Sequence, residues 1–391
     1  MVTLQTADNA LKSYYLDAVS EALNMETNPF LAQIQKTSDN VVGKDVRKVV
    51  KIGVNGGVGA GSETGELPKS SPSDYLQLVA TLKNIYGTIE ISDKAIRASA
   101  NNEGAFVNLL NDEMQSLIKS ASFSFGRMLF GDGTGKIATV KSIVDEKTLL
   151  LDNVYGLAEG MMVDFYTARG EFNEDVSNVK IVAVDYSNDT IVLDVKDELS
   201  SDIMSAGSGV YLQKSYGLEI TGLDAIFSDK IDSLYGVNKD HTLMKPYISE
   251  DAQYISEYAI QRVIDALEQN AGSKVNFIIC SWGVRRAVVE HFRSNGFPLP
   301  TTEINGTMAY LFNGIPLVAD RFCPKGVMYL LNTNDFKLHQ LCDWQWLEGE
   351  DGKILKQIPG KPVYTATLVK YAELMCERPC GQGKITGIIE I

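Results

Sequence analysis

The chain has 391 residues, of which 36 are Lys or Arg and 50 are Asp or Glu, so its formal net charge is −14. Such acidity argues against a protein that wraps nucleic acid, because phosphate binding draws most of its affinity from Lys and Arg. The hydrophobic content of 45% is ordinary for a globular protein. At roughly 100–200 residues per domain, the length predicts about two to four domains.

The beginning of the sequence does not predict a signal peptide. Residues 1–23 have neither a basic n-region nor the continuous apolar stretch that a signal peptide requires. No window approaches about 18 apolar residues without a charge, so we expect no membrane span. An odd, scattered set of cysteines predicts reduced structural thiols in a cytosolic setting. This set comprises Cys280, Cys323, Cys342, Cys376 and Cys380.

The negative charge is concentrated in the middle of the chain. Residues 137–213 carry 5 basic and 14 acidic residues, a net charge of −9, against −2 for residues 1–136 and −3 for residues 214–391. The same segment changes texture, with short apolar runs between polar turns and no long helical pattern. Such a shift in composition predicts a separately folded insertion.

The insertion contains an internal repeat. IVDEKTLLLD at residues 143–152 matches VAVDYSNDTIVLD at residues 182–194, because each reads as a strand ending in Asp, a polar turn and an apolar strand starting at Thr. A further strand near a glycine follows each copy, at residues 160–163 and 209–212. Two related β units about 40 residues apart predict a small barrel or sandwich; chance alternation is the alternative.

Two extended features precede the insertion. Residues 6–24 have apolar positions at helical spacing, which predicts an amphipathic helix that forms either an arm on a neighbouring subunit or a simple surface helix. Residues 44–91 predict a long β-hairpin, with arms at residues 44–54 and 75–91 around a tip rich in Gly, Ser and Pro. A hairpin of that length cannot bury its own faces, so it needs a partner chain.

Neither glycine-rich segment fits a nucleotide site. The hairpin tip lacks the G-x-G-x-x-G spacing and any G-K-[ST] ending. In GDGTGKI at residues 131–137, Phe130 stands where a phosphate loop needs glycine, and Ile137 stands where it needs a hydroxyl for Mg²⁺. We interpret Gly131 as the end of a helix and the following residues as a hinge into the insertion.

The remaining patterns predict helices and strands in alternation. Apolar residues from Asn102 to Phe130 follow helical spacing without proline, which predicts one long helix. Beyond the insertion we expect a helix capped by Ser249 and closed by Gly272, and a second helix capped by Ser281 and ending near Gly296. Strands are predicted at residues 274–280, 315–319, 326–332 and 362–375.

Catalytic signals are weak. Cys280 and His291 could act as thiol and base, but Cys280 ends a buried strand and no third group orients the pair. No C-x-x-C or H-x-x-x-H cluster supports a metal, and Cys376 and Cys380 enclose three residues rather than two. We therefore predict no enzyme and no catalytic, cofactor-binding or metal-binding residues.

The order of these parts resembles the major capsid proteins of tailed bacteriophages, the Hong Kong 97 fold. GAGSETGELPKSSPSDY followed by LKNIYGTIEISDKAIRAS looks like the extended loop returning to the body, and the Asn102–Phe130 rod looks like the spine helix. SYGLEITGLDAIFSD at residues 215–229 and GIPLVADRFCPKGVMYLLNTNDFKLH at residues 314–339 resemble later parts of the capsid domain. The similarity spans nearly the whole chain, except that residues 137–213 are extra to the minimal fold.

The resemblance implies an α+β fold with six parts. These are an N-terminal arm (1–43), an extended loop (44–91), a peripheral domain with the spine helix (92–136), an inserted β domain (137–213), a mainly axial domain (214–332), and the returning peripheral sheet with the axial C-terminal end (333–391). Some relatives cross-link a loop lysine, here Lys69, to a neighbour's asparagine, but the asparagine and the catalytic carboxylate are not identifiable.

The same resemblance implies a structural function. The chain would self-assemble into hexamers and pentamers of an icosahedral head in the virion, built in the bacterial cytoplasm. Expected partners are a portal and a scaffolding protein; because Met1 almost directly precedes the arm, we expect scaffolding to be a separate protein. Contact with packaged double-stranded DNA would be weak and non-specific, and no membrane or cofactor is expected. The alternatives are an encapsulin-like cage for a cargo enzyme and a Cys280–His291 hydrolase.

Overall fold

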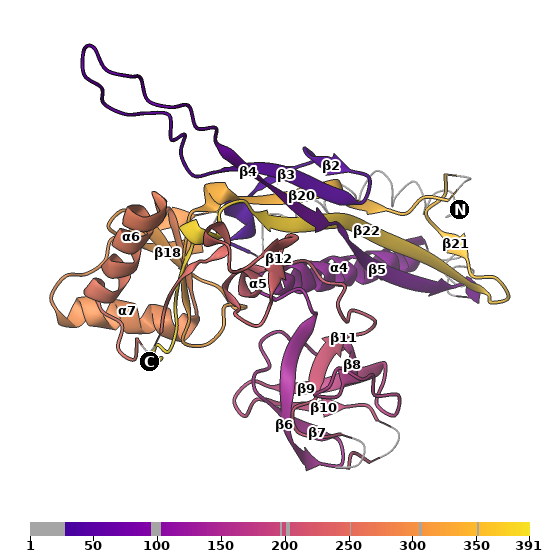
Figure 1. Ribbon diagram of the computed structural model, residues 1–391. Coiled ribbons are helices and arrows are strands. Elements are labelled where there is room, and N and C mark those ends of the chain that lie inside the picture. Colours follow the sequence, from indigo (N-terminus) through magenta and orange to yellow (C-terminus); the bar gives the residue numbers. More distant parts are fainter. Residues whose placement is uncertain are drawn as a thin grey trace.

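The structure, a computed structural model, mixes helices and strands around one elongated body. It describes residues 28–94, 103–195, 198–200, 204–250, 252–304, 307–349 and 352–391. The predicted helix of residues 6–24 lies outside the described residues. Figure 1 shows two projections from the body, a long hairpin at one end and a small barrel on the opposite side.

A five-stranded sheet forms the spine of the body. Its central strand is β22, which pairs along one edge with β5 and along the other with β20; β1 and the short β21 complete the sheet. The long helix α4 lies beneath this sheet and spans roughly 39 Å at 1.5 Å per residue (Figure 1). The bounds are β1 Gln35–Thr37, β5 Lys83–Ser92, α4 Glu103–Met128, β20 Phe336–Trp346, β21 Lys356–Gln357 and β22 Val363–Cys376.

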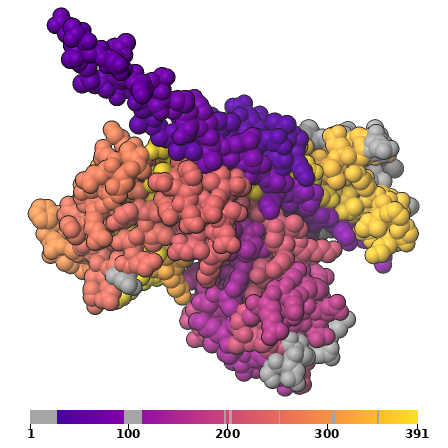
Figure 2. Space-filling view, viewed as in Figure 1, coloured from indigo at the N-terminus to yellow at the C-terminus, as the bar shows by residue number. Residues whose placement is uncertain are grey.

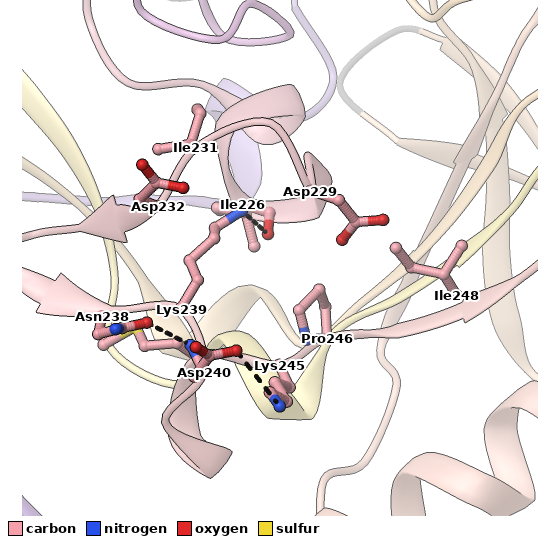
Figure 3. A pocket seen from close by; sticks show the side chains of 11 residues that line it. Ile226, Asp229, Ile231, Asp232, Asn238, Lys239, Asp240, Lys245, Pro246 and Ile248 are labelled. Atoms are coloured by element: carbon pink, nitrogen blue, oxygen red, sulfur yellow. Dashed lines mark hydrogen bonds and ion pairs between the residues drawn. The ribbon is translucent and has the colours of Figure 1, made fainter.

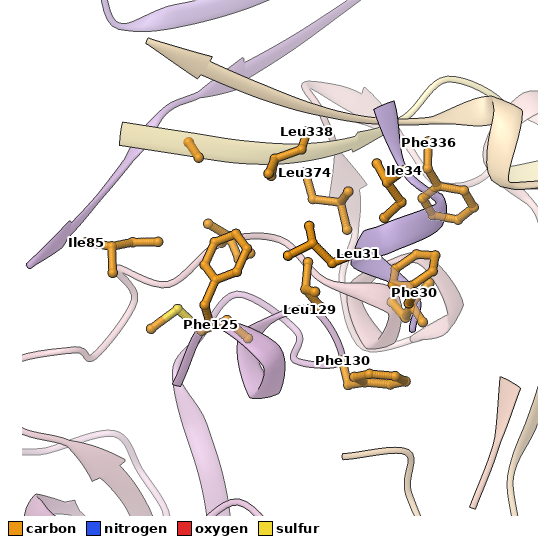
Figure 4. Close-up of a cluster of buried hydrophobic side chains, with 14 of the residues drawn as sticks. Phe30, Leu31, Ile34, Ile85, Phe125, Leu129, Phe130, Phe336, Leu338 and Leu374 are labelled. Carbon is orange, nitrogen blue, oxygen red and sulfur yellow. The ribbon is translucent and has the colours of Figure 1, made fainter. Parts of the chain in front are cut away.

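The main core lies between α4 and this sheet. Met114, Ile118 and Phe125 recur at helical spacing and are buried, as the sequence pattern of α4 predicts. Phe30, in the segment before the short helix η1 (Leu31–Gln33), is fully buried and meets the ring of Phe336 edge-on at 5.3 Å (Figure 4). The segment that precedes the hairpin is therefore fixed between α4 and β20.

The predicted hairpin is shorter than the sequence suggested. β3 (Asp45–Ile52) pairs with β4 (Asp74–Thr81), and β2 (Val41–Val42) adds a third strand. The prediction that the second arm continues to Ile91 is wrong, because the chain changes partner at Leu82 and continues as β5 along β22. Leu82 is buried, and its N–H donates to the carbonyl of Lys44, which closes the hairpin.

A seven-stranded sheet carries the α/β part, in the order β14-β23-β19-β15-β18-β17-β16. Apolar residues of α6 and α7 share one buried cluster with one face of this sheet, whereas the other face packs against the main core. The bounds are β14 Tyr247–Ser249, α6 Glu257–Ala271, β15 Phe277–Cys280, α7 Trp282–Ser294, β16 Thr301–Ile304, β17 Thr307–Phe312, β18 Ile315–Ala319, β19 Met328–Leu331 and β23 Gly383–Ile385.

The two helix caps of this part differ in outcome. Ser281 caps α7 as predicted, since its Oγ accepts the N–H of Val284. The prediction that Ser249 caps α6 is wrong: Ser249 ends β14, and Ser256 is the cap, accepting the N–H of Ala259 at 3.2 Å. The N–H of Thr386 donates to the carbonyl of Ser249, so pairing with a distant segment of the chain holds Ser249 in a strand although its local sequence favours a helix cap.

Residues 136–212 form a closed six-stranded barrel with its own apolar core. The two sequence repeats supply β6-β7-β8 and β9-β10-β11. Exchanging the repeats leaves the set of strand pairings unchanged, because β6–β7 exchanges with β9–β10, β6–β11 exchanges with β8–β9, and β7–β10 and β8–β11 map onto themselves. β7 and β10 show the same alternation of half-buried and buried residues. The bounds are β6 Lys136–Asp145, β7 Thr148–Leu151, β8 Met162–Tyr166, β9 Val179–Asp185, β10 Thr190–Leu193 and β11 Gly209–Leu212.

The two chain segments that connect the barrel to the body run side by side. Gly217 N–H donates to the carbonyl of Thr134 at 2.7 Å, and Gly135 has φ +83° with no space for a side chain beside Ser215. Arg127, in the last turn of α4, forms a buried ion pair with Glu219. These contacts fix the barrel to the C-terminal end of α4, and we call this attachment the root of the barrel.

The chain that leaves the barrel then binds β22. Thr221 N–H donates to Glu373 Oε1 at 2.6 Å, and burial raises the pKa of the Glu373 carboxyl to about 7 against the opposing influences of Thr221 and Lys83. The smaller elements that follow are α5 Leu223–Phe227, β12 Ser233–Leu234, β13 Val237–Asn238 and the single turns η2 Thr242–Met244, η3 Thr333–Asp335 and η4 Pro379–Gly381.

The raised pKa of Glu373 predicts a pH-dependent stability. Because the folded state holds this proton more tightly than the unfolded chain, stability falls as pH rises from about 4.5 to 7 and then levels off. The Glu373→Gln variant lacks this titration, so its stability relative to the parent should rise by up to about 3 kcal/mol between pH 4.5 and 8. Urea unfolding at both pH values measures this difference. Exposed Glu171→Gln is the control, and parallel profiles for Glu373→Gln and the parent would contradict the assignment.

Candidate assembly surface

The β3–β4 hairpin is held firmly where it leaves the body. Val79 N–H donates to the carbonyl of Tyr235 at 2.9 Å, and the buried Tyr235 hydroxyl donates to the carbonyl of Leu374 on β22. The hairpin is therefore tied through the β12–β13 turn to the central strand of the body.

A carboxylate fixes the same region from the other strand. Glu377, just after β22, pairs with Lys48 of β3 at 3.2 Å and with Lys337 of β20 at 3.0 Å. Burial would raise the pKa of Glu377, but the hydrogen bonds and charges of the two lysines lower it overall. The sequence placed Lys48 only within the first predicted arm of the hairpin, since its partner is more than 300 residues away.

The tip of the hairpin extends far from the body (Figures 1 and 2). Residues 53–73 contain no strand, and within them Gly57 N–H donates to the side chain of Asn55. Three apolar side chains of the tip are almost wholly exposed: Val54 at 87%, Val58 at 89% and Leu67 at 88%. Lys69 of the tip is also exposed.

The exposed apolar residues continue down the outer face of the hairpin. Val49 and Tyr75 lie on neighbouring positions of β3 and β4 and are both more than half exposed, beside Lys51. We define the hairpin surface as Val49, Val54, Val58, Leu67 and Tyr75. A projecting apolar surface of this kind is a candidate for contact with another protein, because its apolar side chains are left in water within the single chain.

A pocket of about 550 Å³ opens between α5 and β14 (Figure 3). Lys239 reaches across it and donates to the carbonyls of Ala225 at 2.6 Å and Ile226 at 2.9 Å, so it caps α5, and burial lowers its pKa. The carboxylates of Asp229, Asp232 and Asp240 lie on the exposed rim. Since the lysine is committed to the helix end, we assign no reaction to this pocket.

The structure does not assemble a thiol–imidazole site. Cys280 is fully buried, its Sγ donates to the carbonyl of Val318, and burial raises its pKa far above the usual range, which disfavours a thiolate. His291 lies in the last turn of α7 and contacts Asn295. Within the described part of the chain no hydrogen bond joins Cys280 to His291.

The other candidate motifs have structural roles. In the 131–137 segment, Asp132 Oδ1 accepts both the N–H and the hydroxyl of Thr134, and Lys136 begins β6 with its side chain exposed. All five cysteines are free thiols. Among the described residues, no three His, Cys, Asp or Glu side chains group as metal ligands, and none of the helices there combines the length and apolar character needed to cross a bilayer.

Comparison with known proteins identifies the fold. No protein-family model and no curated protein matches the chain. Among solved structures, the cyanophage A-1(L) capsid asymmetric unit matches with a TM-score of 0.55 at 12% identity, over 93% of each chain. The capsid of an empty GTA particle matches with a TM-score of 0.51 at 12% identity, over 93% of this chain and 91% of the other.

A third match is the holo-SrpI encapsulin complex from Synechococcus elongatus, with a TM-score of 0.46 at 10% identity over 93% of this chain and 88% of the other. That score is too low to favour the cage alternative. The chain has the α+β fold of phage capsid proteins, and the resemblance predicted from the sequence is confirmed at the level of the fold.

The exposed tip generates a direct test of the hairpin surface. Replacing Val54, Val58 and Leu67 together by Ser should change the free energy of unfolding of the subunit by no more than about 0.5 kcal/mol, because these side chains touch little within the chain. The critical concentration for assembly should rise at least about tenfold, since burial of each side chain would contribute roughly 1.5 kcal/mol or more.

Light scattering against protein concentration measures the second effect. The matched control replaces Ser70 and Ser71 of the same tip by Ala and should assemble as the parent does. Unchanged assembly of the Val54, Val58 and Leu67 variant would show that the tip is not an assembly contact.

Proposed function

We propose that the protein is the major capsid protein of a tailed bacteriophage, which self-assembles into the hexamers and pentamers of an icosahedral head. The observation that carries the proposal is a firmly rooted hairpin with an exposed apolar tip on a chain with the capsid fold. In a closed ring, each hairpin reaches the next subunit, so every copy covers the same apolar side chains.

The described elements fit the parts of such a subunit. The β3–β4 hairpin with its tip corresponds to the extended loop, α4 to the spine helix, and the five-stranded sheet to the peripheral domain. The seven-stranded sheet with α6 and α7 corresponds to the axial domain, and the barrel of residues 136–212 to an inserted domain.

The charge distribution suits a shell around nucleic acid. Residues 137–213, which contain all of the barrel except its first residue, carry −9 of the total charge of −14, and we propose that the barrel lies on the outer surface, away from packaged double-stranded DNA. The rest of the chain, at −5, would enclose DNA with only weak, non-specific contact. Its partners would be other copies of itself, a portal and a scaffolding protein, with assembly in the host cytoplasm and a final location in the virion.

Electron microscopy of the purified protein tests the proposal. Shells, rings or tubes are the expected products, and a species that stays monomeric under all assembly conditions would contradict it. Deleting Gly56 to Ser71 should leave a folded subunit, with the circular dichroism of the parent, that builds no stable shell. Normal particles from the deletion would refute the role of the hairpin between subunits.

The same experiment separates the proposal from the cage alternative. Particles that co-purify with one enzyme held by a short terminal peptide, and without DNA, would favour an encapsulin-like cage. The buried, protonated state of Cys280 speaks against the hydrolase alternative.

A further inference from the structure

The last six residues of the chain dock against the seven-stranded part. Ile388 N–H donates to the carbonyl of Gly326 at 3.1 Å, and Gly326 N–H donates to Glu390 Oε1 at 2.8 Å. Glu390 also accepts the hydroxyl of Ser281, the cap of α7, and Arg286 Nε donates to the carbonyl of Ile391. We call residues 386–391 the tail.

The tail therefore binds one side of the turn between β18 and β19. Gly326 has φ +69°, and a Cβ at this position would lie 2.8 Å from the carbonyl oxygen of Ile388, so only glycine fits both the backbone and the tail. At the helix end, Gly283 leaves the space that the Glu390 carboxylate occupies. The negative side chain also lies where the N–H groups of a helix favour an anion.

The other side of the same turn binds the barrel. Lys325, next to Gly326, pairs with Asp189 Oδ2 at 3.4 Å and lies 5.0 Å from the centre of the Tyr155 ring. Asp189 stands in the β9–β10 turn and Tyr155 follows β7, so both partners belong to the barrel. Burial alone would lower the pKa of Lys325, but Asp189 and Tyr155 raise it overall, which agrees with the two contacts.

We infer that the turn of residues 323–327 couples the tail to the barrel: docking of Glu390 orders the turn, and the ordered turn holds Lys325 against Asp189 and Tyr155. The barrel is rooted at α4 through Arg127 and Glu219, and this second contact fixes its rotation about that root. Coupling between two contacts is reciprocal, so loosening either one must loosen the other by the same factor. This inference concerns the single chain and holds whether or not the chain builds a shell.

Hydrogen exchange of the full-length chain, followed by mass spectrometry, tests the coupling. Glu390→Ala should raise exchange in the tail and also in barrel peptides around Tyr155 and Asp189, by about two- to fivefold, the range expected for a partly exposed ion pair. Lys325→Ala should raise exchange in the same barrel peptides and, by reciprocity, in the tail. In the double variant, the increase in exchange rate should be smaller than the product of the increases in the two single variants, because coupled contacts are not additive.

Matched controls separate coupling from general loosening. Lys245→Ala removes an exposed ion pair with Asp240 that involves neither the tail nor the barrel, and should change neither region. Glu390→Gln keeps an acceptor for the N–H of Gly326, so its exchange rates in the tail and the barrel should lie between those of the parent and of Glu390→Ala. This variant keeps the test valid if Glu390→Ala misfolds. Faster exchange in the tail alone for Glu390→Ala, or in the barrel alone for Lys325→Ala, would overturn the inference.

Discussion

Strand β22 is the constraint on which the rest of the subunit depends. Its 14 residues pair with β5 on one side and β20 on the other, and both neighbours lead directly into other parts of the molecule. β5 continues back into the hairpin through Leu82, and Glu377 beyond the end of β22 holds Lys48 of β3. Glu373 of the same strand holds the chain that leaves the barrel. One strand thus sets the direction of both projections.

The two projections differ in whether their apolar side chains are buried within the chain. The barrel closes on itself, so its strands leave no free edge and its core is complete within one chain. The hairpin has one face against the body and a tip that contacts almost nothing. The apolar side chains of the tip would leave water only if a second molecule covered them, and this is the physical basis of the proposed assembly role.

Features that depend on local residues could be predicted from the sequence. The periodic apolar positions of α4, the Ser281 cap and the two Asp-turn-Thr repeats of the barrel all appear in the structure, because neighbouring residues determine them. The Asp residues at the repeat turns accept backbone N–H groups at Lys147 and Ser187, as short polar turns require. The repeat could be recognised in the sequence because both copies form the same short turn with the same Asp hydrogen bond.

Features that depend on distant partners could not be predicted. Ser249 is a residue type that favours helix caps, but pairing with β23 places it in a strand. The break between β4 and β5 at Leu82 arises because β5 pairs with β22, which lies far along the chain. The clamp of Lys48 and Glu377 and the contact of Lys325 with Asp189 leave no local pattern. On the candidate surface, the sequence indicated the hairpin but not which residues of its tip remain uncovered.

The pairing of β5 with β22 also sets an order of events during synthesis. Ser92 pairs with Val363, so the strand that begins the body waits for a partner 271 positions further on. All strand pairings of the barrel lie within residues 136–212. Its contacts therefore join residues that are close in sequence, whereas the pairing of β5 with β22 joins residues that are far apart. A ribosome would release a complete barrel while β5 and the face of α4 beneath it still lacked their covering strand, and that interval is when the nascent subunit is most exposed to association with other chains.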